Sequence, residues 1–72
     1  MPILFSNIGD EVKVAAVGGS PSVKQHLVEL GFNVGTHITI VQKIATGLIV
    51  RVKDARIALD KDMASKIRIT PV

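Results

Sequence analysis

Few side chains in this sequence could take part in covalent chemistry, and they lie far apart along the chain. Cysteine is absent, which excludes a thiolate nucleophile, a disulfide framework and a thiolate metal site. The Gly-x-Ser-x-Gly pattern of a nucleophilic serine is also absent, and the serines stand where turns and helix caps are expected. The acids Asp60 and Asp62 fit the start of a short helical turn with solvated side chains. We therefore expect a protein that is not an enzyme and has no catalytic residue.

The two histidines, His26 and His37, are the remaining candidates for metal ligands. Metal sites in proteins draw three or four ligands from compact spacing patterns. Two separated histidines with scattered carboxylates give no such pattern. A chain of 72 residues also leaves little room for the pocket that a substrate or cofactor needs. The sequence predicts no metal site and no cofactor, and it favours a binding function.

Basic residues are more frequent and more clustered than these groups. Nine Lys and Arg against six Asp and Glu give a formal net charge of +3. Arg51 and Lys53 share one face of a predicted strand, and Arg56 follows across a hairpin, so a basic stripe is expected. Exposed aliphatic side chains are expected beside this stripe. The predicted docking surface for a partner consists of Val28, Val41, Ile49, Arg51, Lys53 and Arg56.

A small barrel that binds nucleic acid is the alternative interpretation of this charge, since Lys and Arg also neutralise phosphates. Such barrels stack bases on aromatic side chains. The sequence has neither Tyr nor Trp, and both Phe5 and Phe32 are expected in the core, so a stacking platform is missing. The same shortage argues against a groove for proline-rich peptides. A protein partner with an acidic surface is therefore favoured.

Alternating hydrophobicity predicts the strands that position these residues. Residues 11–17 are predicted to form a half-buried strand with Val12, Val14 and Ala16 on one face. The same alternation predicts further strands at 37–43, 48–53, 56–59 and 66–70, with a helical turn at 60–65 and a tight hairpin at 53–56. Five short strands in so small a chain favour a partly closed barrel, because closure removes exposed sheet edges. The predicted class is therefore mainly β.

One short helix is predicted between the first two strands. Ser20 is a suitable N-cap, and Pro21 occupies the first helical position. The apolar stripe of this helix is Val23, Leu27 and Leu30. Gly31 fits the left-handed residue that follows a helix end, and Phe32 then folds back onto Leu27 as the Schellman motif requires. This helix end is predicted to seal the core.

The chain is expected to form one domain over residues 1–72. No apolar run approaches the roughly 20 residues that span a bilayer, and the first ten residues lack the features of a signal peptide. We therefore expect a cytoplasmic protein without direct membrane insertion. An uncovered barrel edge would also allow two copies of the chain to pair as a homodimer.

The order of these features resembles the FeoA family. The resemblance is carried by residues 5–10, by Gly18-Gly19, by LVELGFNVGT at 27–36 and by RIAL at 56–59. The Leu-Gly-Phe-x-x-Gly-Thr stretch with Arg-x-Ala-Leu downstream is specific as a combination. The chain departs from the family in holding Lys24, Gln25 and His26 where members often carry arginines. Its central hairpin loop is also shorter than in many members.

The resemblance implies an SH3-like barrel and an accessory role in bacterial ferrous iron uptake. The partner that it implies is the membrane ferrous iron permease with a cytoplasmic GTPase domain, FeoB. Docking of the small protein would shift the conformational equilibrium of the permease through a difference in affinity for its states.

Overall fold

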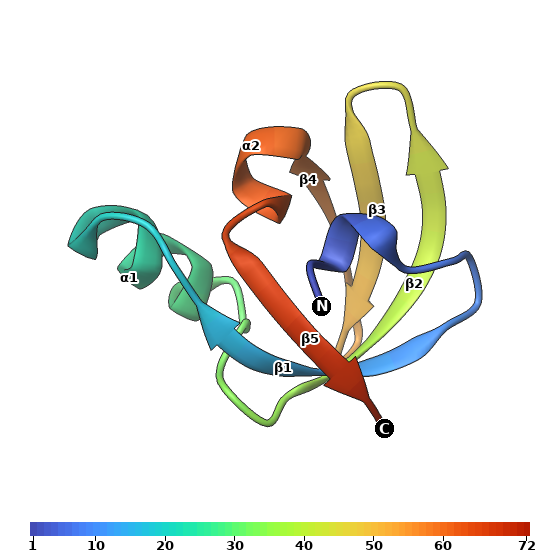
Figure 1. Cartoon of the computed structure of the whole chain (residues 1–72), viewed down its shortest axis with the longest axis horizontal. Helices are drawn as coiled ribbons and strands as arrows, with labels where there is room; N and C mark the ends of the chain where they lie inside the picture. The colour runs from blue at the N-terminus through green and yellow to red at the C-terminus, as the bar shows by residue number, and fades with distance from the viewer.

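The computed structural model describes residues 1–72 as a single bent antiparallel sheet with two short helices and one 3-10 turn (Figure 1). The elements are η1 (Ile3–Phe5), β1 (Glu11–Val17), α1 (Pro21–Glu29), β2 (His37–Ile44), β3 (Gly47–Val52), β4 (Ala55–Asp60), α2 (Lys61–Ala64) and β5 (Ile67–Pro71). The predicted mainly β class, the five strands and the inserted helix are confirmed, with bounds that differ by one or two residues.

The strands lie in the order β4-β3-β2-β1-β5, and each pair of neighbours is antiparallel. β2, β3 and β4, which are consecutive in the chain, form two tight hairpins. Two residues, Lys53 and Asp54, connect β3 to β4, and Lys53 has a φ of 57°. A positive φ at a hairpin turn matches the right-handed twist of the flanking strands, and Lys53 adopts it although glycine or asparagine is the usual choice. The predicted tight hairpin is therefore present.

The alternation predicted for β1 is interrupted. Val12 and Val14 are buried, but Ala16 is exposed, so its predicted place on the inner face is wrong. The pairing of β1 with β5 shifts register between Val14 and Ala16. This irregularity inserts an extra residue into β1, and the residues beyond it change faces. A similar shift between Ile40 and Gln42 interrupts the pairing of β2 with β3.

The core is almost wholly aliphatic and contains one aromatic ring. Its buried hydrophobic residues are Ile3, Val12, Val14, Leu27, Phe32, Ile38, Ile40, Leu48, Val50, Val52, Leu59, Ala64, Ile67 and Ile69. Phe5 was expected in this core, and that expectation is wrong because its side chain is 70% exposed. The cause is η1, which the sequence did not predict. With about three residues per turn, a 3-10 helix points Ile3 and Phe5 in different directions, and Ile3 takes the buried place.

The two ends of α1 follow the predicted capping. The Ser20 hydroxyl accepts a hydrogen bond from the Val23 N–H at 3.4 Å. At the other end, the Phe32 N–H donates to the Leu27 carbonyl and the Gly31 N–H donates to the Val28 carbonyl, each at 3.0 Å. These are the two bonds of a Schellman motif, and Gly31 has the positive φ, 109°, that the motif needs. Phe32 and Leu27 are both fully buried, so the predicted seal on the core is confirmed.

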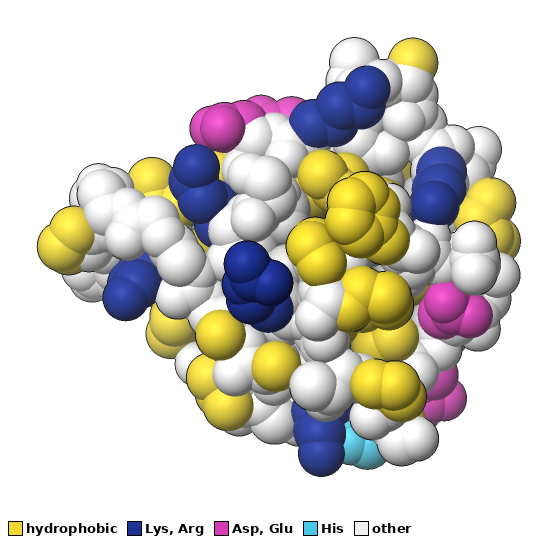
Figure 2. Space-filling model, in the orientation of Figure 1, with side chains coloured by type: hydrophobic (Ala, Val, Ile, Leu, Met, Phe, Trp, Pro, Cys, Tyr) yellow, Lys and Arg dark blue, Asp and Glu magenta, His cyan; other side chains and the backbone are white.

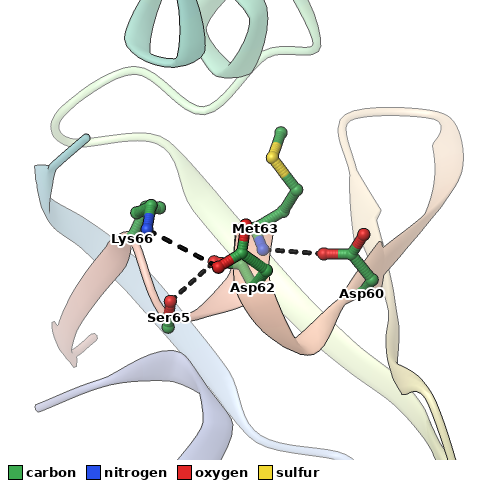
Figure 3. Close-up of polar contacts among 5 residues, drawn as sticks. All are labelled: Asp60, Asp62, Met63, Ser65 and Lys66. Carbon is green, nitrogen blue, oxygen red and sulfur yellow. Dashed lines mark hydrogen bonds and ion pairs between the residues drawn. The ribbon is translucent and has the colours of Figure 1, made fainter. Parts of the chain in front are cut away.

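The short helix α2 is held by its own polar side chains (Figure 3). The Asp60 carboxylate accepts the Met63 N–H at 2.7 Å, and the Ser65 hydroxyl donates to the Asp62 carbonyl at 2.6 Å. Lys66 forms an ion pair with Asp62 at 3.7 Å. The two acids therefore serve a capped helical turn, as predicted, and this turn leads the chain from β4 into β5.

The outer edge of β5 is covered by the start of the chain. The Met1 nitrogen donates to the Ile69 carbonyl at 3.0 Å, and the Ile69 N–H donates to the Met1 carbonyl at 2.7 Å. Pro2 forms an isolated antiparallel bridge with Arg68. Ser6 follows this segment, and its buried hydroxyl donates to the Ile3 carbonyl at 2.5 Å.

A candidate docking surface on the β2–β3–β4 face

The sheet brings most of the predicted docking surface together. Arg51 lies opposite Arg56 on β4, and Ile49 lies opposite Ala58 on the same strand. Val41 lies at the register shift of β2, next to the Gln42 that pairs with Ile49. Residues that are directly opposite in neighbouring antiparallel strands point to the same side of the sheet. Arg51, Arg56 and Ile49 therefore point to the same side of the sheet, and Val41 lies beside them at the irregularity of β2.

Three details differ from the expectation for this surface. Val41 and Ile49 are half-buried and not fully exposed. Lys53 lies in the β3–β4 turn at the end of the face, where it is exposed. Val28 is 45% exposed on α1, which is a separate element at the left of Figure 1 and is not part of the sheet. We use the term basic face for the five residues Val41, Ile49, Arg51, Lys53 and Arg56.

The positive charges of the basic face have no counter-ion within the chain. The only ion pairs are between His37 and Glu11 and between Lys66 and Asp62, both at 3.7 Å. Arg51 and Arg56 instead stand opposite each other on adjacent strands. Like charges in this arrangement destabilise a sheet. The charges of Arg51 and Arg56 therefore do not stabilise the sheet.

The open edge of β4 borders the basic face. β4 ends the sheet and pairs with β3 alone. Ala55–Asp60 contains no Pro and no bulge, and no strand other than β3 pairs with it. A Pro, a bulge or a covering segment usually prevents an edge strand from pairing with other chains. In β4, the charged side chain of Arg56 is the feature that can oppose such pairing.

The histidines and acids do not assemble into a ligand cluster. His26 is exposed on α1, and the nearest acidic partner of His37 is the exposed Glu11. No three His, Asp or Glu side chains come together, and the surface has no pocket. No helix has the length and apolar character required to cross a membrane.

A second exposed surface was missed by the sequence interpretation. Met1, Phe5, Ile8 and Val72 are each more than half exposed. Figure 2 shows apolar side chains gathered over η1 and continuing toward the end of β5. The sequence contains little indication of this surface. The exposure of Phe5 depends on a 3-10 turn, and no hydrophobic periodicity predicts that turn. Its existence also removes one premise used against nucleic acid binding, although a single exposed ring does not provide a stacking platform.

Comparison with known proteins agrees with this architecture. The model of the FeoA domain matches residues 1–71. A protein of Methanocaldococcus jannaschii provisionally named Fe(2+) transport protein A is 28% identical over 68 residues, which cover 94% of this chain and 83% of the relative. The solution structure of iron(II) transport protein A from Clostridium thermocellum superposes with a TM-score of 0.90 at 26% identity, covering 100% of this chain and 46% of that one.

The crystal structure of Stenotrophomonas maltophilia FeoA, solved with zinc, has a TM-score of 0.82 at 25% identity and covers 97% of this chain and 89% of that one. That protein is described as a prokaryotic SH3 domain protein. The five-stranded sheet of the present chain is accordingly a small SH3-like domain. The chain belongs to the FeoA family, whose members are accessory proteins of ferrous iron transport.

Proposed function

We propose that this protein is a non-enzymatic accessory protein of ferrous iron uptake that docks onto the cytoplasmic, GTPase-containing part of the membrane iron permease, FeoB. It acts in the cytoplasm as a protein-binding module. Docking shifts the equilibrium between permease conformations toward the conformation that the small protein binds more tightly. The chain itself carries out no chemistry and holds no resident metal.

The observation that carries this proposal is the uncompensated charge of the basic face. Arg51, Lys53 and Arg56 are exposed and lack an acidic partner, and half-buried aliphatic side chains lie beside them. Interfaces commonly combine an apolar centre with charges that complement the partner. Membership of the FeoA family and the similarity to a protein named for Fe(2+) transport support a partner that takes part in iron transport.

Charge reversal on the basic face tests the proposal. The double variant Arg51→Glu, Lys53→Glu should lose capture of the purified cytoplasmic part of the permease at low salt, because complementary charges speed association and fix orientation. A matched control is Lys13→Glu, Lys24→Glu, which makes the same change in net charge at exposed positions of β1 and α1. Equal capture by a folded Arg51→Glu, Lys53→Glu variant would contradict the placement of the surface.

A further inference from the structure

The backbone of β4 presents unused hydrogen-bonding groups. The two-residue turn at Lys53-Asp54 makes Val52 and Ala55 the closing pair of the β3–β4 hairpin. Hydrogen-bonded and non-hydrogen-bonded pairs alternate along an antiparallel ladder. Ile57 and Leu59 therefore bond to β3, while the N–H and carbonyl groups of Arg56 and Ala58 point to the free edge.

No other part of the chain satisfies these four groups. The hydrogen bonds formed outside the regular elements include none from the backbone of Arg56 or Ala58. No side chain bonds to them either. The equivalent groups of Ile69 on β5 are both bonded to Met1. The chain thus covers the β5 edge of its sheet and leaves the backbone groups at the β4 edge without a partner.

The side chains around this edge indicate what could pair with it. Ala58 is small and exposed, so it offers no steric barrier to an approaching strand. Arg56 and its cross-strand neighbour Arg51 place two unpaired positive charges next to the free backbone groups. A segment added to β4 would lie next to these guanidinium groups. Carboxylates pair with guanidinium groups through charge-assisted hydrogen bonds, whereas a basic segment would be repelled.

We propose that the β4 edge binds an extended acidic segment of the partner as an additional strand of the sheet. The partner backbone would bond to Arg56 and Ala58, and its carboxylates would neutralise Arg51 and Arg56. This is the strand-addition mode of peptide recognition. The inference rests on the proposed docking function and specifies where and how the partner binds.

A second copy of the chain complements this edge less well. β4 carries one acid, Asp60, and that carboxylate already accepts the Met63 N–H as the cap of α2. Self-pairing of β4 would therefore leave Arg51 and Arg56 without free carboxylates. An acidic partner segment removes the charge repulsion that self-pairing would keep.

Substitution of Ala58 by proline provides the test. Pro at position 58 lacks the outward N–H, and no β3–β4 bond is lost because that N–H does not face β3. We expect Ala58→Pro to weaken binding of the purified cytoplasmic part of the permease about tenfold or more, since at least one backbone bond is lost and the edge is blocked. The matched control Ala58→Ser keeps the N–H and should bind within about twofold of the original protein.

Amide hydrogen exchange on the unsubstituted protein gives a second measurement that does not depend on the folding of a variant. The Arg56 and Ala58 amides should exchange rapidly in the free protein and slow markedly in the complex. A blocked peptide of alternating Val and Glu, compared with the same peptide carrying Lys in place of Glu, serves as an independent probe. The acidic peptide should shift the Arg56 and Ala58 amide signals, and the basic peptide should not.

These measurements separate the two proposals. Binding of the acidic peptide at the edge without binding of the permease part would overturn the proposed function and support the edge inference. Binding of the permease part with unchanged exchange at Arg56 and Ala58 and unchanged affinity of Ala58→Pro would overturn the edge inference. A concentration-dependent dimer that Ala58→Pro abolishes would also overturn it, because the occupant would then be a second copy.

Discussion

The two edge strands of the sheet, β4 and β5, differ in whether their outward-facing backbone groups are hydrogen-bonded. At β5, Met1 and Pro2 lie along the strand and occupy the outward groups of Ile69. At β4, the outward groups of Arg56 and Ala58 have no partner in the chain. Unpaired strand edges promote association with other chains, and proteins usually protect them. Within one small domain, one edge of the sheet is therefore covered by the chain itself and the other is open, and the proposed strand addition rests on this difference.

The exposed side chains also differ between the two edges. Near the covered edge Met1, Phe5 and Val72 are exposed, and the only charged residue of β5 is Arg68. Figure 2 shows apolar side chains gathered over η1. The face next to the open edge carries Arg51, Lys53 and Arg56 without counter-ions. Positive charge on an edge strand discourages pairing with neutral or basic strands and selects an acidic one. Under the proposed strand addition, the open edge would select an acidic segment even though it is uncovered.

The largest loss of stability is expected from a substitution in the core, because both edges of the sheet depend on it. Phe32 is fully buried at the end of α1, and Phe32→Ala should lower the free energy of unfolding by about 3–5 kcal/mol. The matched control is Phe5→Ala, which removes an exposed ring and should change stability by less than about 0.5 kcal/mol. Thermal and urea unfolding would measure both. Similar losses for the two variants would show that Phe32 does not anchor the core.

A glycine in β3 allows the open edge to be broken selectively. A Cβ added at Gly47 would lie 1.8 Å from the Leu59 carbonyl oxygen and 2.8 Å from Asp60 Cα, so β4 would have to move away from β3. We expect Gly47→Ala to cost about 3 kcal/mol, at the upper end of overpacking effects. Gly18→Ala is the control, because its added Cβ would be at 3.5 Å from the Lys66 carbonyl. Amide exchange should accelerate first in β3 and β4, and uniform acceleration would argue against selective damage.

The covered edge should respond to the loss of the Ser6 hydroxyl. Ser6→Ala removes a buried hydrogen bond to the Ile3 carbonyl and should destabilise the protein by about 1 kcal/mol. Because η1 follows Met1 and Pro2, the Ile69 amide should exchange faster while the Arg56 and Ala58 amides keep their rates. The exposed Ser22 offers a control in Ser22→Ala. Unchanged exchange at Ile69 would mean that Ser6 does not hold the covering segment.

The smallest change in stability is expected from removing a charge on the basic face, and this change is a gain. Arg56→Thr removes the repulsion with Arg51 and should stabilise the free protein by about 0.5 kcal/mol at low ionic strength. The gain should decrease as salt is added, because ions screen exposed charges. Arg68→Thr, on β5 opposite Ala16, removes equal charge without a like-charged neighbour and should show no such gain. Lower stability of Arg56→Thr at low salt would contradict the repulsion.

Local sequence patterns predicted the parts of the fold that depend on neighbouring residues. The N-cap at Ser20, the Schellman motif at Gly31 and the burial of Phe32 each follow from chemistry within a few positions. Strand faces were predicted wherever pairing is regular, as at Leu48, Val50 and Val52. These features need no knowledge of distant contacts.

Features set by distant pairing could not be predicted in this way. The irregularity that turns Ala16 outward depends on the register with β5, which follows it by many residues. The exposure of Phe5 depends on η1 docking at the covered edge, with Ile3 in the core. For the docking surface, alternation identified the charged stripe, whereas the separation of Val28 from it required the placement of α1. The free groups of β4 became visible only with the strand order.

The two phenylalanine rings lie in contrasting environments and can therefore report on two different events. Phe32 is completely enclosed and Phe5 lies largely in solvent, and no Tyr or Trp adds signals to theirs. In a proton NMR spectrum, the ring resonances of Phe32 would follow cooperative unfolding. The ring resonances of Phe5 would instead respond to any molecule that binds to the apolar surface over η1. Titrations of the unlabelled protein could therefore separate global melting from local contact within a single sample.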